Sequence, residues 1–258
     1  MTVQETYARF AKFYDAYTAQ YVGDIPFYLV AVAGRQPPLL EVGCGSGRIL
    51  VALLRAGHTV TGVDVSEEML ALAQRKLKQE PLGRKGALLL HDFAKGPLPG
   101  QYGAALITFY TFNYVPPHER LAFLKNLGRN LVEGAPVTLP LFYPTVLVHP
   151  ELDGQWQAKG RYRIDGEEIA LLDCRRMLDE HTEERRQRYE SSTGTSEEIQ
   201  TVRYYLSPVE MAGLLSAAGF AQVRVGWDLQ FEHLAPWTGR NEPSGEYMVM
   251  AERMVSQG

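Results

Sequence analysis

The sequence predicts an α/β fold: a mostly parallel sheet with crossover helices, interrupted by an antiparallel β insertion. From residue 39 onward, apolar strand-like runs alternate with helix-like stretches across short turns, which is the pattern of a parallel sheet. Between residues 145 and 206 the helical period is lost, and strand-like runs follow one another between charged or turn-like segments. We therefore expect a core of residues 35–144 and 207–258, with an antiparallel insertion of residues 145–206.

The composition argues against several other classes of protein. The 258 residues are 45% hydrophobic, which suits one domain of ordinary size with room for an insertion. The net charge is −4, and basic residues gather only around residues 174–188, which argues against a dedicated nucleic-acid binder. Cys44 and Cys174 stand far apart without a CxxC motif or a histidine cluster, so we expect no disulfide and no metal site.

The sequence shows no membrane or export signal. No apolar run approaches the roughly 20 residues of a membrane helix, and the start, "MTVQETYARFAKFYD", lacks a basic head followed by an apolar core. We expect a soluble cytoplasmic protein.

The first three strands and two helices follow from local signals. "PLLEVG" (38–43) predicts a strand, and "RILVALLRAG" predicts a helix that ends at Gly57. "TVTGVDV" (59–65) is rich in β-branched residues and predicts the second strand. Ser66 is expected to cap the next helix, whose first turn carries two glutamates at the positive end of the helix dipole. "GALLLHD" (86–92) predicts the third strand.

The rest of the core follows in the same way. "YGAALITFYTF" (102–112) predicts a fourth strand, and the leucines of "PHERLAFLKNLGRNL" lie on one face of a helix. "EGAPVTLPLFYP" (133–144) should be a fifth strand, short or bent because proline donates nothing to a ladder. Ser207 begins a helix with a capping box that ends at Gly219, and "AQVRVGWDL" and "EYMVMAERM" predict the last two strands.

Residues 1–34 form an N-terminal helical segment with aromatic side chains at helical spacing. Tyr7, Phe10, Tyr14 and Tyr17 follow one another along one face, with Tyr21 one turn further. This face either packs on the core or covers a ligand site, and the spacing alone leaves both open.

Alternate glycines follow the first strand as G-x-G-x-G, at Gly43, Gly45 and Gly47. A dinucleotide-binding turn has the spacing G-x-G-x-x-G instead. Glu41, just before the turn, would repel a pyrophosphate but attract an ammonium group, directly or through water. The turn therefore favours a ligand with an ammonium group, although a nicotinamide-dependent oxidoreductase stays an alternative.

Acidic residues end the next two strands. Asp64 ends the second strand, where a carboxylate can accept hydrogen bonds from both ribose hydroxyls of a nucleoside. Asp92 ends the third strand, where its carboxylate can accept from an adenine amino group while the N–H of Phe93 reaches a ring nitrogen.

Taken together, these residues resemble the motif series of class I S-adenosylmethionine-dependent methyltransferases that act on small molecules. The series covers roughly residues 35–140 and runs, in order, through "EVGCGSGR", the acid of "GVDVS", "HDF" and "YGAALITFYTFNYV". The tail "YYLSPVEMAGLLSAAGF" also resembles the family. The resemblance further implies that the N-terminal helical segment, residues 1–34, covers the cofactor site. The resemblance implies a Rossmann-like fold with a seven-stranded, mostly parallel sheet flanked by helices, one antiparallel strand, and the ligand at the carboxyl ends of the strands.

The resemblance and the motifs together give a set of expected site residues. For S-adenosylmethionine, and S-adenosylhomocysteine as its product, they are Glu41, Gly43, Cys44, Gly45, Gly47, Asp64, Val65, Met69, Asp92, Phe93, Phe109, Tyr14 and Tyr21. For the acceptor pocket they are Tyr110, Asn113, Tyr143 and Trp156. No catalytic base is assigned, and the candidates are His149, His233 and Tyr14.

The expected activity is methyl transfer to a nitrogen or oxygen of a small molecule, with the insertion as a lid over the acceptor. The cofactor carries the reactive group, so a general base is optional for an amine acceptor. An RNA methyltransferase that uses the arginine-rich patch, or a non-catalytic protein that binds the cofactor, remain alternatives. "YVPPHE" departs from the N/D-P-P-aromatic motif of enzymes that methylate nucleobases. The protein is expected to be a monomer or a homodimer.

Overall fold

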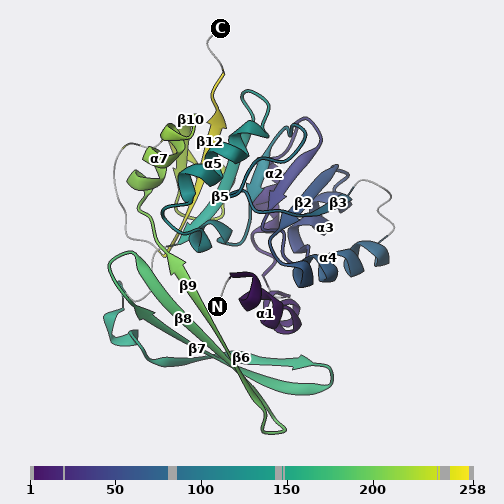
Figure 1. Cartoon of the computed structure of the whole chain (residues 1–258), viewed down its shortest axis with the longest axis vertical. Helices are drawn as coiled ribbons and strands as arrows, with labels where there is room; N and C mark the ends of the chain where they lie inside the picture. Colours follow the sequence, from purple (N-terminus) through teal and green to yellow (C-terminus); the bar gives the residue numbers. More distant parts are fainter. Residues whose placement is uncertain are drawn as a thin grey trace.

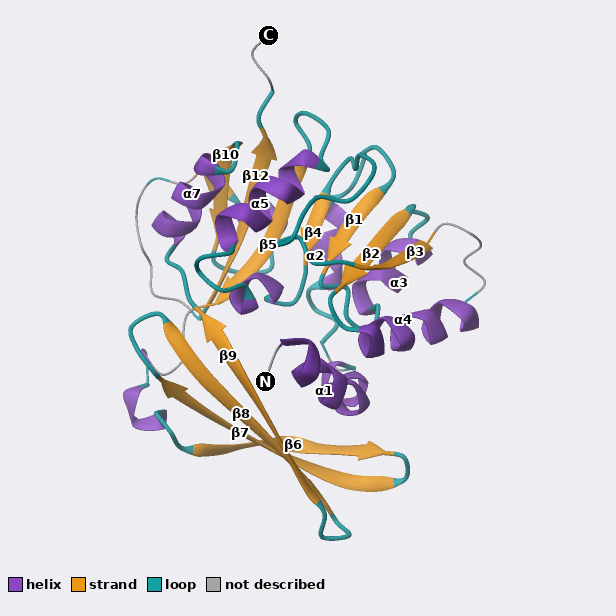
Figure 2. Ribbon diagram, in the orientation of Figure 1, coloured by secondary structure: helices purple, strands orange, loops and turns teal. Residues whose placement is uncertain are grey.

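The computed structural model describes residues 3–19, 21–80, 86–142, 147, 149–236, 238 and 245–255, with side chains from residue 10 onward. The core holds a mixed sheet flanked by helices, and a separate antiparallel sheet lies against one of its ends (Figures 1 and 2). The structure thus confirms the predicted Rossmann-like α/β fold with an antiparallel insertion.

The core sheet has eight strands in the order β11-β10-β12-β5-β4-β1-β2-β3. β12 runs antiparallel to β5 and β10, and β11 runs antiparallel to β10, whereas β5, β4, β1, β2 and β3 pair in parallel. The core strands are β1 (Leu39–Val42), β2 (Val60–Asp64), β3 (Gly86–Leu90), β4 (Ala105–Ile107), β5 (Pro136–Phe142), β10 (Phe220–Gly226), β11 (Ala235–Pro236) and β12 (Glu246–Arg253). β11 adds a two-residue edge strand to the seven expected.

Helices cover both faces of this sheet. α2 (Ile25–Ala31) and α3 (Arg48–Arg55) pack on one face, and α5 (Arg120–Arg129) and α7 (Pro208–Ala217) pack on the other. α4 (Glu67–Gln79) follows β2 and contacts β2 and β3. Because successive side chains of β1 face opposite sides, Leu39 enters one apolar cluster and Leu40 the other.

The predicted helix caps are present. The Ser66 hydroxyl accepts a hydrogen bond from the N–H of Met69 at 3.2 Å, which fixes the start of α4. Ser207 and Glu210 form the expected capping box at the start of α7. Both signals are local in the sequence, which is why they could be read from it.

The structure corrects the expected extent of two strands. β5 extends over seven residues and pairs with β12 along its whole length, so of the two alternatives, short or bent, the first is wrong. β4 pairs with β5 only at Val137 and Thr138, so neither Pro136 nor Pro140 is needed as a donor to that neighbour. The fourth strand ends at Ile107 instead of continuing through "FYTF".

The early end of β4 has a backbone cause. Phe109 and Tyr110 both adopt positive φ angles, 48° and 61°, and two successive left-handed residues break the extended backbone of a strand. A 3₁₀ turn, η1 (Thr111–Tyr114), follows directly. The aromatic side chains of this segment are therefore presented at the carboxyl end of the sheet instead of alternating across it.

The insertion is a four-stranded antiparallel sheet in chain order, and it follows a short 3₁₀ turn, η2 (Pro150–Leu152). Its strands are β6 (Trp156–Ile164), β7 (Glu167–Met177), β8 (Thr182–Ser191) and β9 (Ser196–Tyr204). Another 3₁₀ turn, η3 (Phe231–His233), lies before β11. Among the described helices, none is both long and apolar enough to cross a membrane.

The N-terminal helix α1 (Val3–Thr18) lies between the core and the insertion sheet (Figure 1). It contacts α4 of the core and β6 and β9 of the insertion. Phe10 and Phe13 of α1 join Met69 of α4 and Tyr189 of β8 in one apolar cluster. The Phe13 and Tyr189 rings are stacked 4.0 Å apart, so α1 joins the two sheets through apolar contacts.

Candidate active site

The glycine turn lies between β1 and α3 at the carboxyl edge of the sheet. The N–H groups of Gly43 and Cys44 both donate to the carbonyl of Val63, at 2.8 and 3.0 Å, which joins the turn to β2. A Cβ atom on Gly43 would collide with the Thr111 side chain. Gly45 has a φ of 53°, and a Cβ there would lie 3.4 Å from the Tyr14 hydroxyl, so only glycine lets the backbone pass this close.

Asp64 at the end of β2 fixes the turn from the other side. Its carboxylate accepts hydrogen bonds from the N–H of Gly45 at 2.8 Å and from the N–H of Ser66 at 3.0 Å. Burial raises the pKa of Asp64, and these backbone donors oppose that effect. A carboxylate has about four acceptor positions, so acceptor capacity remains for a ligand.

A cavity of about 420 Å³ opens above this turn. Eight of the expected cofactor residues line it: Tyr14, Gly43, Gly45, Asp64, Val65, Asp92, Phe93 and Phe109. They come from α1, the glycine turn and the carboxyl ends of β2, β3 and β4, so the topology gathers residues that lie up to 95 positions apart in the sequence.

The other expected cofactor residues do not line this cavity. Met69 is fully buried in the apolar cluster beneath α1, and Cys44 is buried beside Gly62. Gly47 lies one residue before α3, where an added Cβ would approach Ala73 at 3.1 Å. Tyr21 lines a second cavity instead.

Glu41 also lies outside the cavity lining, behind the turn. Its side chain is 1% exposed, and Oε1 accepts from the Thr108 hydroxyl at 2.9 Å. Oε2 has no hydrogen-bond partner within the described part of the chain. Burial raises the pKa of Glu41 to about 8, although Thr108 and Arg48 oppose the shift. The structure therefore does not bring Glu41 into the cavity lining, so a direct contact between this carboxyl and a ligand there is not formed.

Several residues that line the cavity were not expected from the sequence. They include Thr111 and Tyr114 of η1 and Glu119 and Phe123 near the start of α5. They reach the cavity because the chain leaves β4 through a left-handed turn, and no local pattern in "TFYTFNYV" indicates that turn. His91 lines the cavity as well, and its Nε2 lies 2.9 Å from the carbonyl of Gly96.

A second cavity, of about 450 Å³, lies between the core and the insertion sheet. Its walls come from α1, the segment after β4, β5, the insertion strands β7, β8 and β9, and the start of β12. Tyr14, Phe109 and Tyr114 line both cavities. The two cavities therefore share one aromatic wall.

The expected acceptor residues are divided by the structure. Tyr110 lines the second cavity. Asn113 is fully buried and donates to the carbonyl of Tyr204, and Trp156 lies against the guanidinium groups of Arg186 and Arg188. Neither appears in the lining of the two cavities. Tyr143 lies outside the described residues.

The three catalytic candidates lie in different surroundings. His149 and His233 are largely exposed and face Glu151 and Asp228, respectively. Neither lines the two cavities. Tyr14 lies on the shared wall, and burial raises its pKa above the usual range. Its hydroxyl stays protonated, so it can donate a hydrogen bond but cannot act as a base at neutral pH.

Polar contacts hold α1 over the glycine turn. Asp15 of α1 accepts from the Ser46 hydroxyl at 2.5 Å and from the Lys76 ammonium at 2.6 Å. Lys76 also donates to the Ser46 hydroxyl at 2.9 Å. The three groups connect α1, the turn and α4, so the segment that carries Tyr14 is fixed beside the first cavity.

Known proteins resemble this chain in sequence and in fold. Residues 39–134 match a family described as a methyltransferase domain. Magnesium-protoporphyrin O-methyltransferase of Synechocystis is 34% identical over 131 residues, which are 47% of this chain and 55% of that protein. The chain spans between 17% and 55% of the first four curated relatives it matches.

Solved structures match over almost the whole chain. The CcbJ methyltransferase of Streptomyces caelestis has a TM-score of 0.71 at 22% identity, over 90% of both chains. The sugar N-methyltransferase KedS8 of Streptoalloteichus has a TM-score of 0.71 at 17% identity, over 94% of this chain and 92% of that one. Residues 39–134 therefore resemble a methyltransferase domain, and the chain shares the Rossmann-like fold of these solved methyltransferases.

Proposed function

We propose that this protein transfers a methyl group from S-adenosylmethionine to a nitrogen of a small-molecule acceptor. The observation that carries the proposal is the pair of cavities that share Tyr14, Phe109 and Tyr114. The first cavity is lined by eight of the thirteen residues expected for the cofactor, and the second lies against the insertion that is expected to act as the acceptor lid.

The first cavity suits the chemical groups of the cofactor. Gly43 and Gly45 leave space where side chains would otherwise stand, which suits the methionine part. Asp64 retains acceptor positions for ribose hydroxyls, and Asp92 lies at the end of the neighbouring strand for the adenine amino group. When bound, S-adenosylmethionine would supply an electrophilic methyl group on its sulfonium.

The shared wall suits a direct transfer between the cavities. Methyl transfer from a sulfonium is an in-line displacement, so the protein has to bring donor and acceptor into alignment and exclude water. Aromatic side chains serve both needs, because they are rigid and apolar. Their π faces also attract the cationic sulfonium.

Nitrogen is the better acceptor atom because strong bases are scarce in the second cavity. Its described lining contains no histidine. Burial raises the pKa values of Tyr14, Tyr28 and Tyr110, so these phenols stay protonated. Tyr17 differs, because Arg185 lowers its pKa against the effect of burial, but its hydroxyl is already bonded to that guanidinium. A neutral amine needs no base before it attacks, whereas a hydroxyl does. Two similar structures are named as sugar and glycopeptide N-methyltransferases.

RNA is a weaker candidate, because much of the arginine patch is already paired. Arg186 and Arg188 lie near Glu184 and Glu198 and against the Trp156 ring. Phosphate binding would require cations that remain free to contact the backbone.

The test is S-adenosylhomocysteine release by the purified protein in the presence of amine and hydroxyl compounds, together with calorimetric titration of S-adenosylmethionine. Two variants separate the cavities: Ala94→Trp fills the first and Leu229→Trp fills the second. We expect Ala94→Trp to abolish cofactor binding, and Leu229→Trp to preserve binding but lose turnover. Binding of NAD without either adenosyl ligand would contradict the proposal.

A further inference from the structure

Three arginines of the insertion sheet line the second cavity: Arg175, Arg185 and Arg203. They belong to β7, β8 and β9. Because side chains alternate between the two faces of a sheet, the register of these strands places all three arginines on the same face, which meets the core. Arg175 pairs in register with Arg185, and Arg203 pairs with Glu183. Arg185 is 7% exposed and Arg203 is 4% exposed, whereas the Arg175 side chain is 23% exposed, so two of the three cations are buried and the third is partly open to solvent.

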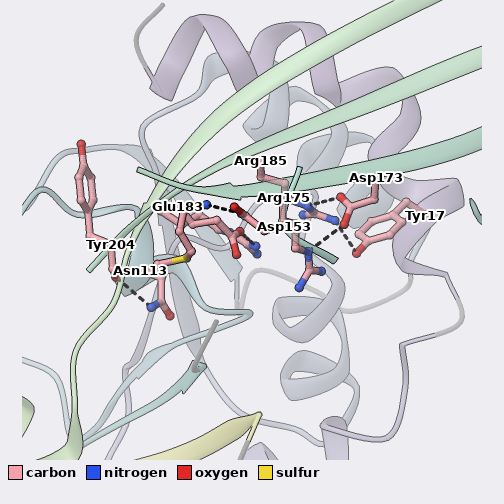
Figure 3. A network of polar contacts seen from close by, with 10 residues as sticks. Tyr17, Asn113, Asp153, Asp173, Arg175, Glu183, Arg185 and Tyr204 are labelled. Atoms are coloured by element: carbon pink, nitrogen blue, oxygen red, sulfur yellow. Dashed lines mark hydrogen bonds and ion pairs between the residues drawn. The ribbon is translucent and has the colours of Figure 1, made fainter. Parts of the chain in front are cut away.

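Two buried carboxylates compensate the cluster in part. Figure 3 shows Arg175 and Arg185 converging on Asp173, whose oxygens accept from their Nε atoms at 2.8 and 2.5 Å. Glu183 accepts from Arg203. Although burial opposes it, the two guanidinium groups lower the pKa of Asp173 to about 2, so this carboxylate is ionised. The cluster thus has three cations and two anions.

The other acids in the cavity lining do not balance the remaining charge. Asp24 is held by Arg48 through two hydrogen bonds of 2.6 and 2.7 Å. Glu246 is exposed to solvent, and it takes part in a hydrogen bond with Tyr110. Water screens such an exposed charge. Tyr17 of α1 also lines the cavity; its hydroxyl accepts from Arg185, which lowers the pKa of Tyr17 against the effect of burial. Among the described carboxylates of the lining none balances the third arginine, so the surplus positive charge belongs to the inner face of the insertion.

Arg203 shows that the cluster has unused donor capacity. Its Nε is buried and has no hydrogen-bond partner among the described residues. Its guanidinium lies 4.3 Å from the centre of the Phe142 ring, at the end of β5. A buried donor without a partner costs free energy, and Arg203 keeps one such donor that no described residue satisfies.

We infer that the acceptor carries an anionic oxygen group, a carboxylate or a phosphate, which binds the Arg175–Arg185–Arg203 cluster. This inference rests on the proposed function, since it assigns the second cavity to the acceptor. Guanidinium groups match such anions with paired hydrogen bonds. The anion balances the surplus charge, and the far end of the acceptor then reaches the shared wall with its nitrogen.

The experiment uses the full chain saturated with S-adenosylhomocysteine. Phenyl phosphate, benzoate and the neutral analogue benzamide are titrated calorimetrically at constant ionic strength. Arg175→Gln removes the surplus charge and leaves the Asp173–Arg185 and Glu183–Arg203 pairs intact. Arg176→Gln is the matched control, because it makes the same charge change at the neighbouring exposed position.

We expect at least one anionic probe to bind the unmodified protein at least tenfold more tightly than benzamide. Arg175→Gln should reduce this preference to threefold or less, and Arg176→Gln should preserve it. The tighter of phenyl phosphate and benzoate identifies the anion. Equal or absent binding of all three probes overturns the inference, as does a preference that survives Arg175→Gln. Failure of S-adenosylhomocysteine to bind in the first step overturns the proposed function instead.

Discussion

Among single residues, Asp64 both holds the backbone of the glycine turn and lines a cavity. It holds the backbone of Gly45 and Ser66 through hydrogen bonds, and it lines the cavity proposed for the cofactor. A single carboxylate therefore links the shape of the glycine turn to the binding of the ribose.

We expect Asp64→Ala to raise the dissociation constant for S-adenosylmethionine at least tenfold. Hydrogen bonds to a charged acceptor contribute about 1.5–3 kcal/mol each, and about 1.4 kcal/mol corresponds to a factor of ten. Calorimetric titration measures the effect, and unfolding temperatures without ligand show whether the turn survives. Asp228→Ala, the same change at an exposed position, is the control. Unchanged affinity in a folded Asp64→Ala protein would remove Asp64 from the site.

Glu41 makes the stability of the fold depend on pH. Burial raises its pKa from 4.5 to about 8 in the folded protein. Between these values the folded state keeps a proton that the unfolded state has released, so the free energy of unfolding falls as the pH rises from about 4.5 to 8. The stabilising contribution is complete below pH 4.5 and lost above pH 8.

Glu41→Gln should flatten this dependence, because glutamine does not titrate. The difference in slope between the two proteins should approach at most about 1.4 kcal/mol per pH unit. Urea unfolding at pH 5.5, 6.5 and 7.5 measures it. Parallel curves for the two proteins would show that Glu41 is ionised in the folded state.

At the scale of elements, α1 forms part of the wall of the cavity proposed for the cofactor. It carries Tyr14, and it is held to the glycine turn and to α4 through Asp15, Ser46 and Lys76. The Lys76 and Asp15 side chains are 33% and 41% exposed, so their ion pair is partly screened and its contribution is modest.

Lys76→Met should accelerate the release of S-adenosylhomocysteine by up to about fivefold, which corresponds to about 1 kcal/mol for a partly exposed pair. Stopped-flow displacement measures the dissociation rate. Lys78→Met, on the exposed side of the same helix, should leave the rate unchanged. Equal rates in both variants would mean that the contact does not hold α1 in place.

In the whole molecule, the core, α1 and the insertion sheet lie against one another (Figure 1). Residues of α1 and the core line the first cavity described above, and residues of all three line the second. Ligand in the first cavity touches α1 and the core at once. Binding should therefore stabilise the assembly of these parts as well as the glycine turn itself.

S-adenosylhomocysteine at 100 times its dissociation constant should stabilise the protein by about 2.7 kcal/mol. For a chain of this size the unfolding temperature should rise by several degrees. Hydrogen exchange should slow in α1 and residues 43–47, and remain unchanged in the hairpin turn around residues 192–195. A rise with NAD, or protection restricted to the core, would contradict this arrangement.

The sequence by itself determined the α/β alternation, the caps at Ser66 and Ser207 and the glycine turn with its two following acids. These signals are local: each depends on a few neighbouring residues and on the known geometry of strand, turn and helix. For the same reason, Asp64 and Asp92 could be assigned to the edge of a parallel sheet before their surroundings were known.

Only the tertiary structure decided which side chains meet. The left-handed backbone at Phe109 and Tyr110 ends β4 early and places Phe109 on the wall that the two cavities share. Met69 and Asn113, which the sequence assigned to the site, are buried in the interior instead. The arginine cluster needed the register of three insertion strands and their position against α1, where Arg185 donates to the Tyr17 hydroxyl 168 residues away. Such contacts depend on long-range pairing, which leaves no local trace in the sequence.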